Sequence, residues 1–303
     1  MRVMPAARSL TFGDTTVQLT NTDRVVFADV GITKGEVIDY YASIADVIVP
    51  ELAGRPLSIE RFTKGIEAGG FFQKHVQKHY PDYVDRALLG TKTRVNYPIC
   101  NDAATLVYLV NQGGFVLHIW TSRKQAPNNP DMIVFDLDPP DGRFDLVQQT
   151  ARLLHDLLSE IDLSAFVKTT GSKGLHVVAP LDGTATFEEV HALTNAIGTL
   201  LCERHPDIVT MEFYKKDRKG RLFFDTLRNA LGATVVAPYS LRGRPGAPVS
   251  APIEWEELDD VTPNGITMTD IAARLDSIGD PWSNLRARSG SVKKATKKLA
   301  ALG

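Results

Sequence analysis

Cysteine is scarce in this sequence. The 303 residues contain two cysteines, Cys100 and Cys202, which lie far apart and belong to no paired motif. Disulfide frameworks and cysteine-based zinc sites need several cysteines at short, recurring spacings, so the sequence excludes both. Isolated cysteines are compatible with the reducing cytoplasm, where thiols stay reduced.

Long hydrophobic runs are also missing. No stretch approaches the roughly 18 apolar residues that a membrane-spanning helix needs. The N-terminal residues 1–12 (MRVMPAARSLTF) lack the apolar centre of a signal peptide. The composition, 43% hydrophobic and 23% charged, is that of an ordinary globular protein. We therefore expect a soluble, cytoplasmic protein that does not bind membranes.

An excess of positive charge is absent as well. Lys and Arg number 34 against 36 Asp and Glu, which gives a formal net charge of −2. A protein that coats DNA is usually basic overall. Any contact with nucleic acid must therefore come from a local basic patch.

The expected helices and strands indicate an α+β fold. Over residues 130–240, neighbouring strands follow each other directly, which is typical of a mixed sheet rather than strict βαβ alternation. Thr33 and Glu36 predict a capping box at the start of a helix. Apolar spacing predicts helices at 34–48, 102–110, 144–161 and 187–205. Strands are expected at 15–19, 57–62, 115–120, 132–138, 166–169, 175–179, 209–214 and 222–225, with the last two joined as a hairpin.

Asp136 and Asp138 carry the strongest chemical signal. They end the apolar strand 132–138 (MIVFDLD), and residues two apart on a strand point to the same face. Two adjacent carboxylates at the edge of a core are unfavourable unless a cation lies between them. Mg²⁺ and Mn²⁺ prefer carboxylate oxygens, and two such ions about 3.5–4 Å apart can promote phosphoryl transfer. An isolated D-x-D is more often a simple acidic turn. The interpretation as a metal site therefore depends on the other motifs.

A glycine-rich turn follows at residues 170–176 (TGSKGLH). Its exposed backbone N–H groups can bind an anion, Thr170 and Ser172 add hydroxyl groups, and Lys173 adds a positive charge. His176 begins the next strand and can donate to a phosphate oxygen. The turn is not a Walker motif, because G-x-x-x-x-G-K-[ST] and a following long helix are missing. A polar hairpin turn with an incidental histidine is the alternative.

Asp225 and two arginines complete the candidate site. Asp225 ends the apolar strand 222–225 and supplies a third carboxylate, which allows two metal ions to bind while positions stay open for substrate. Arg242 and Arg244 follow the apolar run 235–237, and arginine suits bidentate phosphate binding. Alone, each would more often be a strand-end or surface residue.

These motifs, in this order, resemble the archaeo-eukaryotic primase superfamily. More closely, the segments around Tyr97 (YPICNDAAT), Phe135 (FDLDP), Gly171 (GSKGLH) and Ala237 (APYSLRGR) are similar to the polymerase domain of bacterial ligase D, which serves non-homologous end joining. The resemblance spans about residues 20–257. It implies a mixed-sheet primase-polymerase core with flanking helices and an N-terminal α/β portion packed on it.

The resemblance also implies a role for each motif residue. The expected ligands of two Mn²⁺ or Mg²⁺ ions are Asp136, Asp138 and Asp225. The residues expected around the incoming nucleotide are Phe71, Phe72, His118, Thr170, Ser172, Lys173, Gly174, His176 and Arg242. The residues expected to grip the 5′-phosphate of a downstream DNA strand are Arg61, Lys64 and Lys74.

Phe71 and Phe72 are expected to stack on a base, which is worth roughly 1–3 kcal/mol per base. Core packing is the alternative, but the preceding Gly69 and Gly70 favour an exposed loop. Three positions depart from the family pattern. Thr170 stands where some members have Ser, Glu60 where a basic residue is common, and Arg228 where some members have Gln.

The implied activity is addition of NTPs or dNTPs to a primer 3′ end on a DNA template, with filling of short gaps during repair. Ku and a DNA ligase are the candidate protein partners, and a bacterial nucleoid-associated location is expected. A primase is one alternative. A non-catalytic DNA-end-binding module is another, although three retained carboxylates favour an enzyme. A metal-dependent phosphohydrolase would use the same carboxylates.

The sequence is expected to form a single catalytic domain over residues 1–285, with an N-terminal part to about 125 and a catalytic core over about 126–260. No ligase or nuclease motif follows, so we expect a stand-alone chain. Residues 286–303 form a basic tail, expected to be a solvated helix end or disordered segment rather than a nucleic-acid contact.

Overall fold

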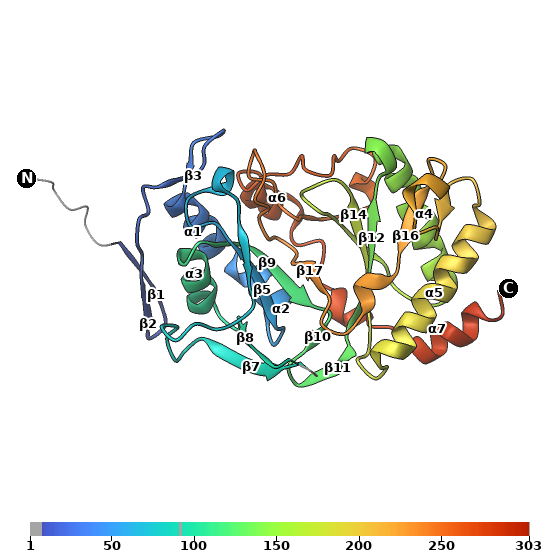
Figure 1. Ribbon diagram of the computed structural model, residues 1–303, viewed down its shortest axis with the longest axis horizontal. Coiled ribbons are helices and arrows are strands. Elements are labelled where there is room, and N and C mark those ends of the chain that lie inside the picture. Colours follow the sequence, from blue (N-terminus) through green and yellow to red (C-terminus); the bar gives the residue numbers. More distant parts are fainter. Residues whose placement is uncertain (1–7, 91–92, 303) are drawn as a thin grey trace, which may run out of the picture.

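Two β-sheets with helices packed on them form most of the molecule (Figure 1). The computed structural model describes residues 8–90 and 93–302, so most of the segment considered for a signal peptide lies outside the described residues. The helices are α1 (Lys34–Ser43), α2 (Ala45–Leu52), α3 (Ala103–Asn111), α4 (Phe144–Glu160), α5 (Phe187–Arg204), α6 (Ile271–Ile278) and α7 (Val292–Leu299).

The larger sheet has six strands in the order β15-β16-β12-β14-β13-β18. All of its pairs are antiparallel except β15 with β16. These strands are β12 (Met132–Asp138), β13 (Phe166–Thr169), β14 (Leu175–Pro180), β15 (Val209–Thr210), β16 (Leu222–Asp225) and β18 (Pro252–Ile253).

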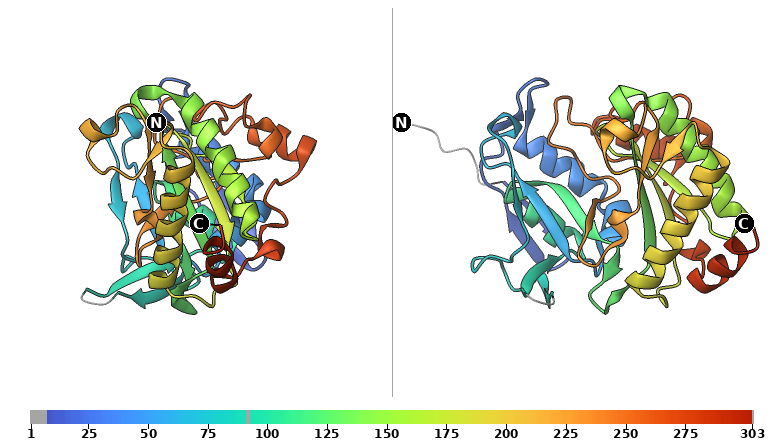
Figure 2. Two further views of the ribbon diagram at one scale, coloured as in Figure 1. Left: turned by 90° about the vertical axis from the view of Figure 1, so that its right-hand side faces the viewer. Right: turned by 45° about the vertical axis from the view of Figure 1, so that its right-hand side comes forward.

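Helices α4 and α5 cover one face of this sheet (Figure 2). Phe135 and Leu137 are fully buried, and the Phe135 ring packs 5.3 Å from that of Phe224. Gly198 of α5 approaches this pair so closely that a Cβ there would lie 2.9 Å from the Phe224 ring. Because side chains alternate along a strand, Asp136 and Asp138 point to the opposite face, away from these helices.

The smaller sheet belongs to the N-terminal half and has the order β17-β9-β5-β6. On β5 and β9, the side chains of Leu57, Ile59, Leu117 and Ile119 are buried, and α3 contacts β9. The capping box of Thr33 and Glu36 begins α1, as predicted. The strands are β5 (Leu57–Arg61), β6 (Phe71–Gln73), β9 (Gly114–Trp120) and β17 (Thr234–Val236).

Four antiparallel strand pairs lie outside these sheets. They are β1 (Ser9–Phe12) with β2 (Thr15–Gln18), β3 (Val25–Phe27) with β4 (Ile32–Thr33), β7 (Asp85–Leu89) with β8 (Val95–Ile99), and β10 (Ser122–Arg123) with β11 (Ala126–Pro130). The buried apolar residues of both sheets form one continuous cluster. The boundaries expected at about residues 125 and 285 remain predictions.

The segment after β17 is fastened to both halves of the molecule. The Tyr40 hydroxyl donates to the Tyr239 carbonyl at 2.7 Å, and the Leu241 N–H donates to the Tyr41 hydroxyl at 2.9 Å. The Tyr239 N–H donates to the carbonyl of Ser250, which lies just before β18. Residues distant in sequence thus hold the backbone that carries Arg242.

The single helix predicted over residues 34–48 is wrong. The structure has two helices, α1 and α2, separated at Ile44, and α2 continues to Leu52. The Ser43 hydroxyl donates to the Tyr40 carbonyl at 2.8 Å. Such back-bonding competes with the helical N–H and is a known local cause of helix bending.

The hairpin predicted between residues 209–214 and 222–225 is also wrong. Strand β15 ends at Thr210 and pairs with β16 in parallel. The connecting loop is held by arginines rather than by strand pairing. Arg218 donates to the carbonyls of Glu212 and Phe213, and Arg221 donates to those of Pro206 and Asp217.

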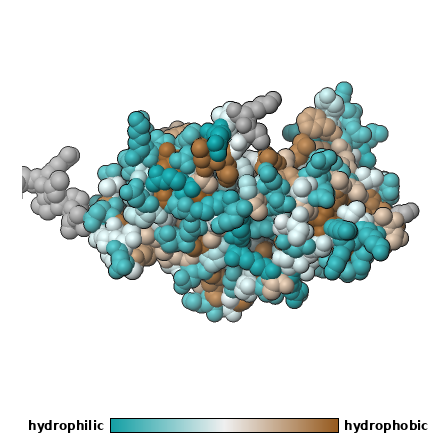
Figure 3. Space-filling view, turned by 90° about the horizontal axis from the view of Figure 1, so that it is seen from below, coloured by the Kyte–Doolittle hydropathy of each residue, from teal (hydrophilic) through white to brown (hydrophobic). Residues whose placement is uncertain are grey.

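The basic C-terminal segment contains helix α7, which packs beside α5 (Figure 1). Val292, Ala295 and Leu299 are buried, while the lysines of the helix are exposed. The described part of this segment is therefore an ordered helix with a solvated basic face. Seen from below, hydrophilic side chains cover most of the surface and hydrophobic ones form small groups (Figure 3).

No helix in residues 8–90 and 93–302 has both the length and the apolar character that crossing a membrane requires.

The alternation along β12 is testable by stability. Leu137→Ala removes a buried side chain and should lower the free energy of unfolding by about 2–5 kcal/mol. Asp138→Ala changes a side chain on the other face, where the Asp136 charge opposes ionisation, and should leave the free energy of unfolding unchanged or raise it. Urea unfolding measures both. Equal losses in the two variants would contradict this orientation of the strand.

Candidate active site

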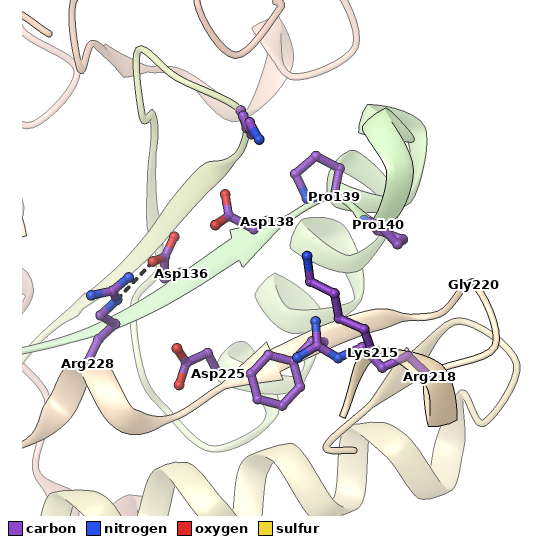
Figure 4. Close-up of a pocket in the computed structure, with 11 residues that line it drawn as sticks. Asp136, Asp138, Pro139, Pro140, Lys215, Arg218, Gly220, Asp225 and Arg228 are labelled. Atoms are coloured by element: carbon purple, nitrogen blue, oxygen red, sulfur yellow. Dashed lines mark hydrogen bonds and ion pairs between the residues drawn. The ribbon is translucent and has the colours of Figure 1, made fainter. Parts of the chain in front are cut away.

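The three predicted carboxylates lie at one edge of the larger sheet. Asp136 is paired in register with Asp225 on β16 and with His176 on β14. Residues directly opposite on neighbouring strands share a face. Figure 4 shows the carboxylates turned toward a common space. The prediction that Asp136 and Asp138 share a face is therefore confirmed, and Asp225 joins them from a strand 84 residues later in the chain, on which the register places it directly opposite Asp136.

Positive and polar groups offset the charge of Asp136. Its Oδ2 accepts a hydrogen bond from Arg228 Nε at 2.9 Å, and its Oδ1 lies 3.4 Å from His176 Nε2. Burial disfavours the ionised carboxylate, but His176 and Arg228 outweigh burial, so the pKa of Asp136 lies well below its ordinary value. Burial and the neighbouring Asp136 charge raise the pKa of Asp138.

Two adjoining pockets share Asp136, Asp138 and Arg228. The first, here called the carboxylate pocket, also contains Asp225, Lys173 of the glycine-rich turn, and Lys215, Arg218 and Phe223. The second, here called the histidine pocket, also contains His118, Thr170, Ser172, His176 and Arg242. The shared residues place a space lined by three carboxylates and several basic side chains beside a space lined by two histidines and a half-buried arginine.

The donor set of the carboxylate pocket fits hard divalent cations, which prefer carboxylate oxygens. As positioned, however, no three Asp, Glu, His or Cys side chains of the described residues form a group that could hold a metal ion. The Arg228 guanidinium instead supplies the positive charge beside Asp136. Three carboxylates therefore face the pocket, one of them paired with an arginine.

The glycine-rich turn is packed directly against the end of β12. A Cβ at Gly174 would lie 1.9 Å from the Leu137 carbonyl oxygen and 3.0 Å from Asp138 Oδ1, so only glycine fits there. The Thr170 hydroxyl donates to the Gly174 carbonyl at 3.0 Å and accepts from the Gly174 N–H at 3.2 Å. Thr170 therefore closes the turn, while Ser172 faces the histidine pocket and Lys173 the carboxylate pocket.

The two histidines have buried nitrogens that lack hydrogen-bond partners in the described structure, namely His118 Nε2 and His176 Nδ1. Burial, aided by the charge of Arg242, lowers the pKa of His118 to about 3. Burial, aided by the charge of Lys168, lowers the pKa of His176 to about 4. Both are therefore neutral near pH 7, and a neutral imidazole has one N–H donor. His176 directs its N–H at Asp136 through Nε2, whereas His118 can offer its N–H to a ligand.

Arg242 approaches the histidine pocket from the segment that follows β17. Its backbone N–H donates to the Pro248 carbonyl at 2.9 Å. Burial, together with the nearby Arg244, lowers the pKa of the Arg242 guanidinium. Arginine remains charged despite such shifts, so a fixed positive charge lies beside the histidines.

Phe71 and Phe72 are 50% and 57% exposed, as expected, but they lie on strand β6, paired with β5, and not in the expected loop. The Phe72 ring lies 5.3 Å from that of His118, at the histidine pocket. Arg61 lies 5.7 Å from the Phe71 ring and donates to the Gln112 carbonyl and to Gln73 Oε1. Both acceptors are neutral, which leaves the charge of Arg61 available to an anion. Lys64 and Lys74 are exposed.

Four basic residues near the site had no assigned role in the sequence-based prediction. Lys215 and Arg218 belong to the basic loop that was interpreted as a hairpin connection. Arg228 lies three residues after Asp225 and was noted only as a departure from the family pattern. The fourth, Lys168, lies on β13 opposite His176. The cluster of basic residues before β16 could have indicated that Lys215 and Arg218 belong to the site.

The chain matches the model of the LigD primase-polymerase domain over residues 33–282. It belongs to this family. Family members are nucleotidyltransferases, and the chain is accordingly an enzyme of the primase-polymerase class. The resemblance inferred from the motifs is confirmed.

Similar proteins include two named as multifunctional or bifunctional non-homologous end joining protein LigD. The Mycolicibacterium smegmatis protein is 34% identical over 92% of this chain and 37% of its own length. The Bacillus subtilis protein is 31% identical over 88% of this chain and 43% of its own length. The chain thus spans well under half the length of these relatives.

A solved structure confirms the fold class. The polymerase domain of Mycobacterium tuberculosis ligase D, determined in complex with DNA, is 33% identical with a TM-score of 0.84. The match covers 90% of this chain and 99% of that domain. The α+β fold is therefore the fold of the LigD polymerase domain.

The burial of His118 predicts a pH dependence of stability. Its pKa is about 3 when folded and about 6.5 when unfolded. Between these values the unfolded chain binds more protons, so stability falls as the pH drops. Between pH 7 and pH 5, wild type should lose about 2 kcal/mol more than His118→Gln. Urea unfolding at both pH values measures this, with the exposed His79→Gln as control. Equal losses in wild type and His118→Gln would contradict the assignment.

Proposed function

We propose that this chain is a repair polymerase that adds NTPs or dNTPs to a primer 3′ end and fills short DNA gaps. The observation that carries the proposal is the shared edge of the two pockets. Carboxylates from β12 and β16 face one space, and a glycine-rich turn, two neutral histidines and a half-buried arginine face the next. This is the arrangement needed to hold metal-bound phosphates.

Asp136, Asp138 and Asp225 are the residues that would hold two Mn²⁺ or Mg²⁺ ions. Such ions lower the pKa of a bound hydroxyl and neutralise charge on the transferring phosphoryl group. Arg228 would have to leave Asp136 Oδ2 for that oxygen to bind a metal ion. Asp136 stays ionised at all physiological pH values, because its pKa is depressed.

The residues of the histidine pocket would orient the triphosphate. His118 would offer a buried and otherwise unpaired N–H donor, which strengthens a hydrogen bond to an anion, and His176 would hold Asp136 in place through Nε2. Arg242 and Lys173 offset the charge that grows on the leaving pyrophosphate. Phe72, beside His118, offers an exposed ring on which a base can stack.

Two observations support a DNA substrate: a further group of basic residues, Arg61, Lys64 and Lys74, and the names of the relatives. Arg61, supported by Lys64 and Lys74, would bind the 5′-phosphate of the strand downstream of a gap. The relatives carry non-homologous end joining in their names, and the similar solved domain binds DNA. We therefore place the activity in end joining at the bacterial nucleoid, with Ku and a DNA ligase as partners.

Extension of a primer across a short gap tests this function. Asp136→Asn should lower the rate by roughly 10²–10³-fold or more, because a metal-binding carboxylate is lost. The exposed Asp207→Asn is the matched control and should extend like wild type. The assay would compare NTPs with dNTPs in Mn²⁺ and in Mg²⁺.

The same assay tests the substrate. Extension should weaken when the downstream strand carries a 5′-hydroxyl in place of the 5′-phosphate. Tight DNA binding without any extension, unchanged in Asp136→Asn, would instead identify a DNA-end-binding module. Products formed without a primer would identify a primase, and release of phosphate without extension a phosphohydrolase.

A further inference from the structure

A row of polar residues crosses four neighbouring strands of the larger sheet. Asp225 on β16 is in register with Asp136 on β12, Asp136 with His176 on β14, and His176 with Lys168 on β13. Opposite residues share a face, so all four point to the same side. The row therefore runs from two carboxylates, through a histidine, to an ammonium group.

Lys168 is 1% exposed and forms no salt bridge with any carboxylate of the described residues. Within residues 8–90 and 93–302, its Nζ has one hydrogen-bond partner, the Ser250 hydroxyl. The charged and titratable groups around it are Arg242, Asp136 from β12, His176 from β14 and His118 from β9. Burial, with the charge of Arg242, lowers the pKa of Lys168 well below its ordinary value.

A buried ammonium without a carboxylate is unfavourable for folding. Such a lysine adds little to the stability of the fold, because an apolar side chain of similar shape would pack there without the free-energy cost of burying a charge. The unpaired positive charge is instead well placed to act on an anion that enters from outside. The pocket nearest to it is the histidine pocket, whose residues His176, His118 and Arg242 surround Lys168.

We infer that Lys168 is a positioning residue that supplies positive charge beneath the triphosphate site of the histidine pocket. The inference rests on the proposed function. Lys168 does not line the pocket and so does not touch the nucleotide. It acts through the electrostatic field at the phosphates, where a buried charge is weakly screened by water and salt.

Lys168 has a second connection to the site through Ser250. The Ser250 hydroxyl donates to the Thr169 carbonyl at 3.0 Å, and the Ser250 N–H donates to the Ser240 carbonyl at 2.9 Å. These bonds join the strand before the glycine-rich turn to the segment that carries Arg242. Removing the Ser250 hydroxyl breaks this connection but keeps the Lys168 ammonium group. Such a variant therefore distinguishes the effect of the connection, here called the tether, from the effect of the charge.

The test compares triphosphate affinity with stability in the full chain. The probe is inorganic tripolyphosphate, titrated calorimetrically in metal-free buffer, with ATP as a second probe. Lys168→Met keeps the length of the stem and removes the charge. It should weaken tripolyphosphate binding by about tenfold, the order expected for one buried charge near an anion. Its Tm should stay equal to that of wild type or rise by about 2–4 °C.

Two variants serve as matched controls. Lys34→Met removes another buried lysine, whose Nζ bonds the Thr20 hydroxyl and carbonyl in the N-terminal half, and should leave tripolyphosphate affinity unchanged. Ser250→Ala keeps the Lys168 charge and should weaken affinity by less than Lys168→Met does. A loss in Ser250→Ala as large as in Lys168→Met would assign the effect to the tether and overturn the inference.

The remaining outcomes are also decisive. Wild-type affinity in Lys168→Met would show that the charge does not act at the pocket. Weaker binding together with a lower Tm, or failure to fold, would show that Lys168 is a structural residue. If wild type itself binds neither tripolyphosphate nor ATP, the triphosphate site of the proposed function fails, and the inference falls with it.

Discussion

The carboxylates of Asp136 and Asp138 leave the same face of β12, and the repulsion between them shapes the rest of the site. Phe135 and Leu137, packed under α4 and α5, fix which face the carboxylates take. With that face fixed, counter-charge has to arrive from other elements. Arg228 provides it for Asp136, with the neutral His176 imidazole beside the other carboxylate oxygen, while Asp138 keeps a raised pKa because burial and the nearby Asp136 oppose its ionisation. In the proposed function, a metal ion would replace this arginine beside Asp136.

Carboxylates and positively charged side chains alternate over a short distance across this sheet. The carboxylate pocket lies at one end of the polar row, and the histidine pocket lies over the other, with Lys168 beneath it. A nucleoside triphosphate with bound metal ions has the complementary pattern, because its phosphates are anionic and its ions are cationic. The low pKa of both histidines has the same origin, since a neutral imidazole does not add to the repulsion between Arg242 and Lys168.

Sequence patterns predicted the parts of this arrangement that depend on local periodicity. Alternation along β12 placed Asp136 and Asp138 on one face, and the glycines of residues 170–176 predicted a tight turn. The missed features depend on contacts between distant segments. Strand β16 pairs with β12, which is distant in sequence, as well as in parallel with β15, and the break at Ile44 leaves no sign in the apolar spacing of residues 34–48. The position of Lys168 opposite His176 follows from strand register, which no local pattern encodes.

The central claim is that the three carboxylates bind two divalent cations once Arg228 releases Asp136. A crystal grown with Mn²⁺ and a nucleoside triphosphate, measured at the manganese absorption edge, tests it directly. The account predicts two anomalous peaks among Asp136, Asp138 and Asp225, with the Arg228 guanidinium displaced from Asp136 Oδ2. A carboxylate pocket without manganese, with the Arg228 to Asp136 hydrogen bond intact beside a bound triphosphate, would contradict it.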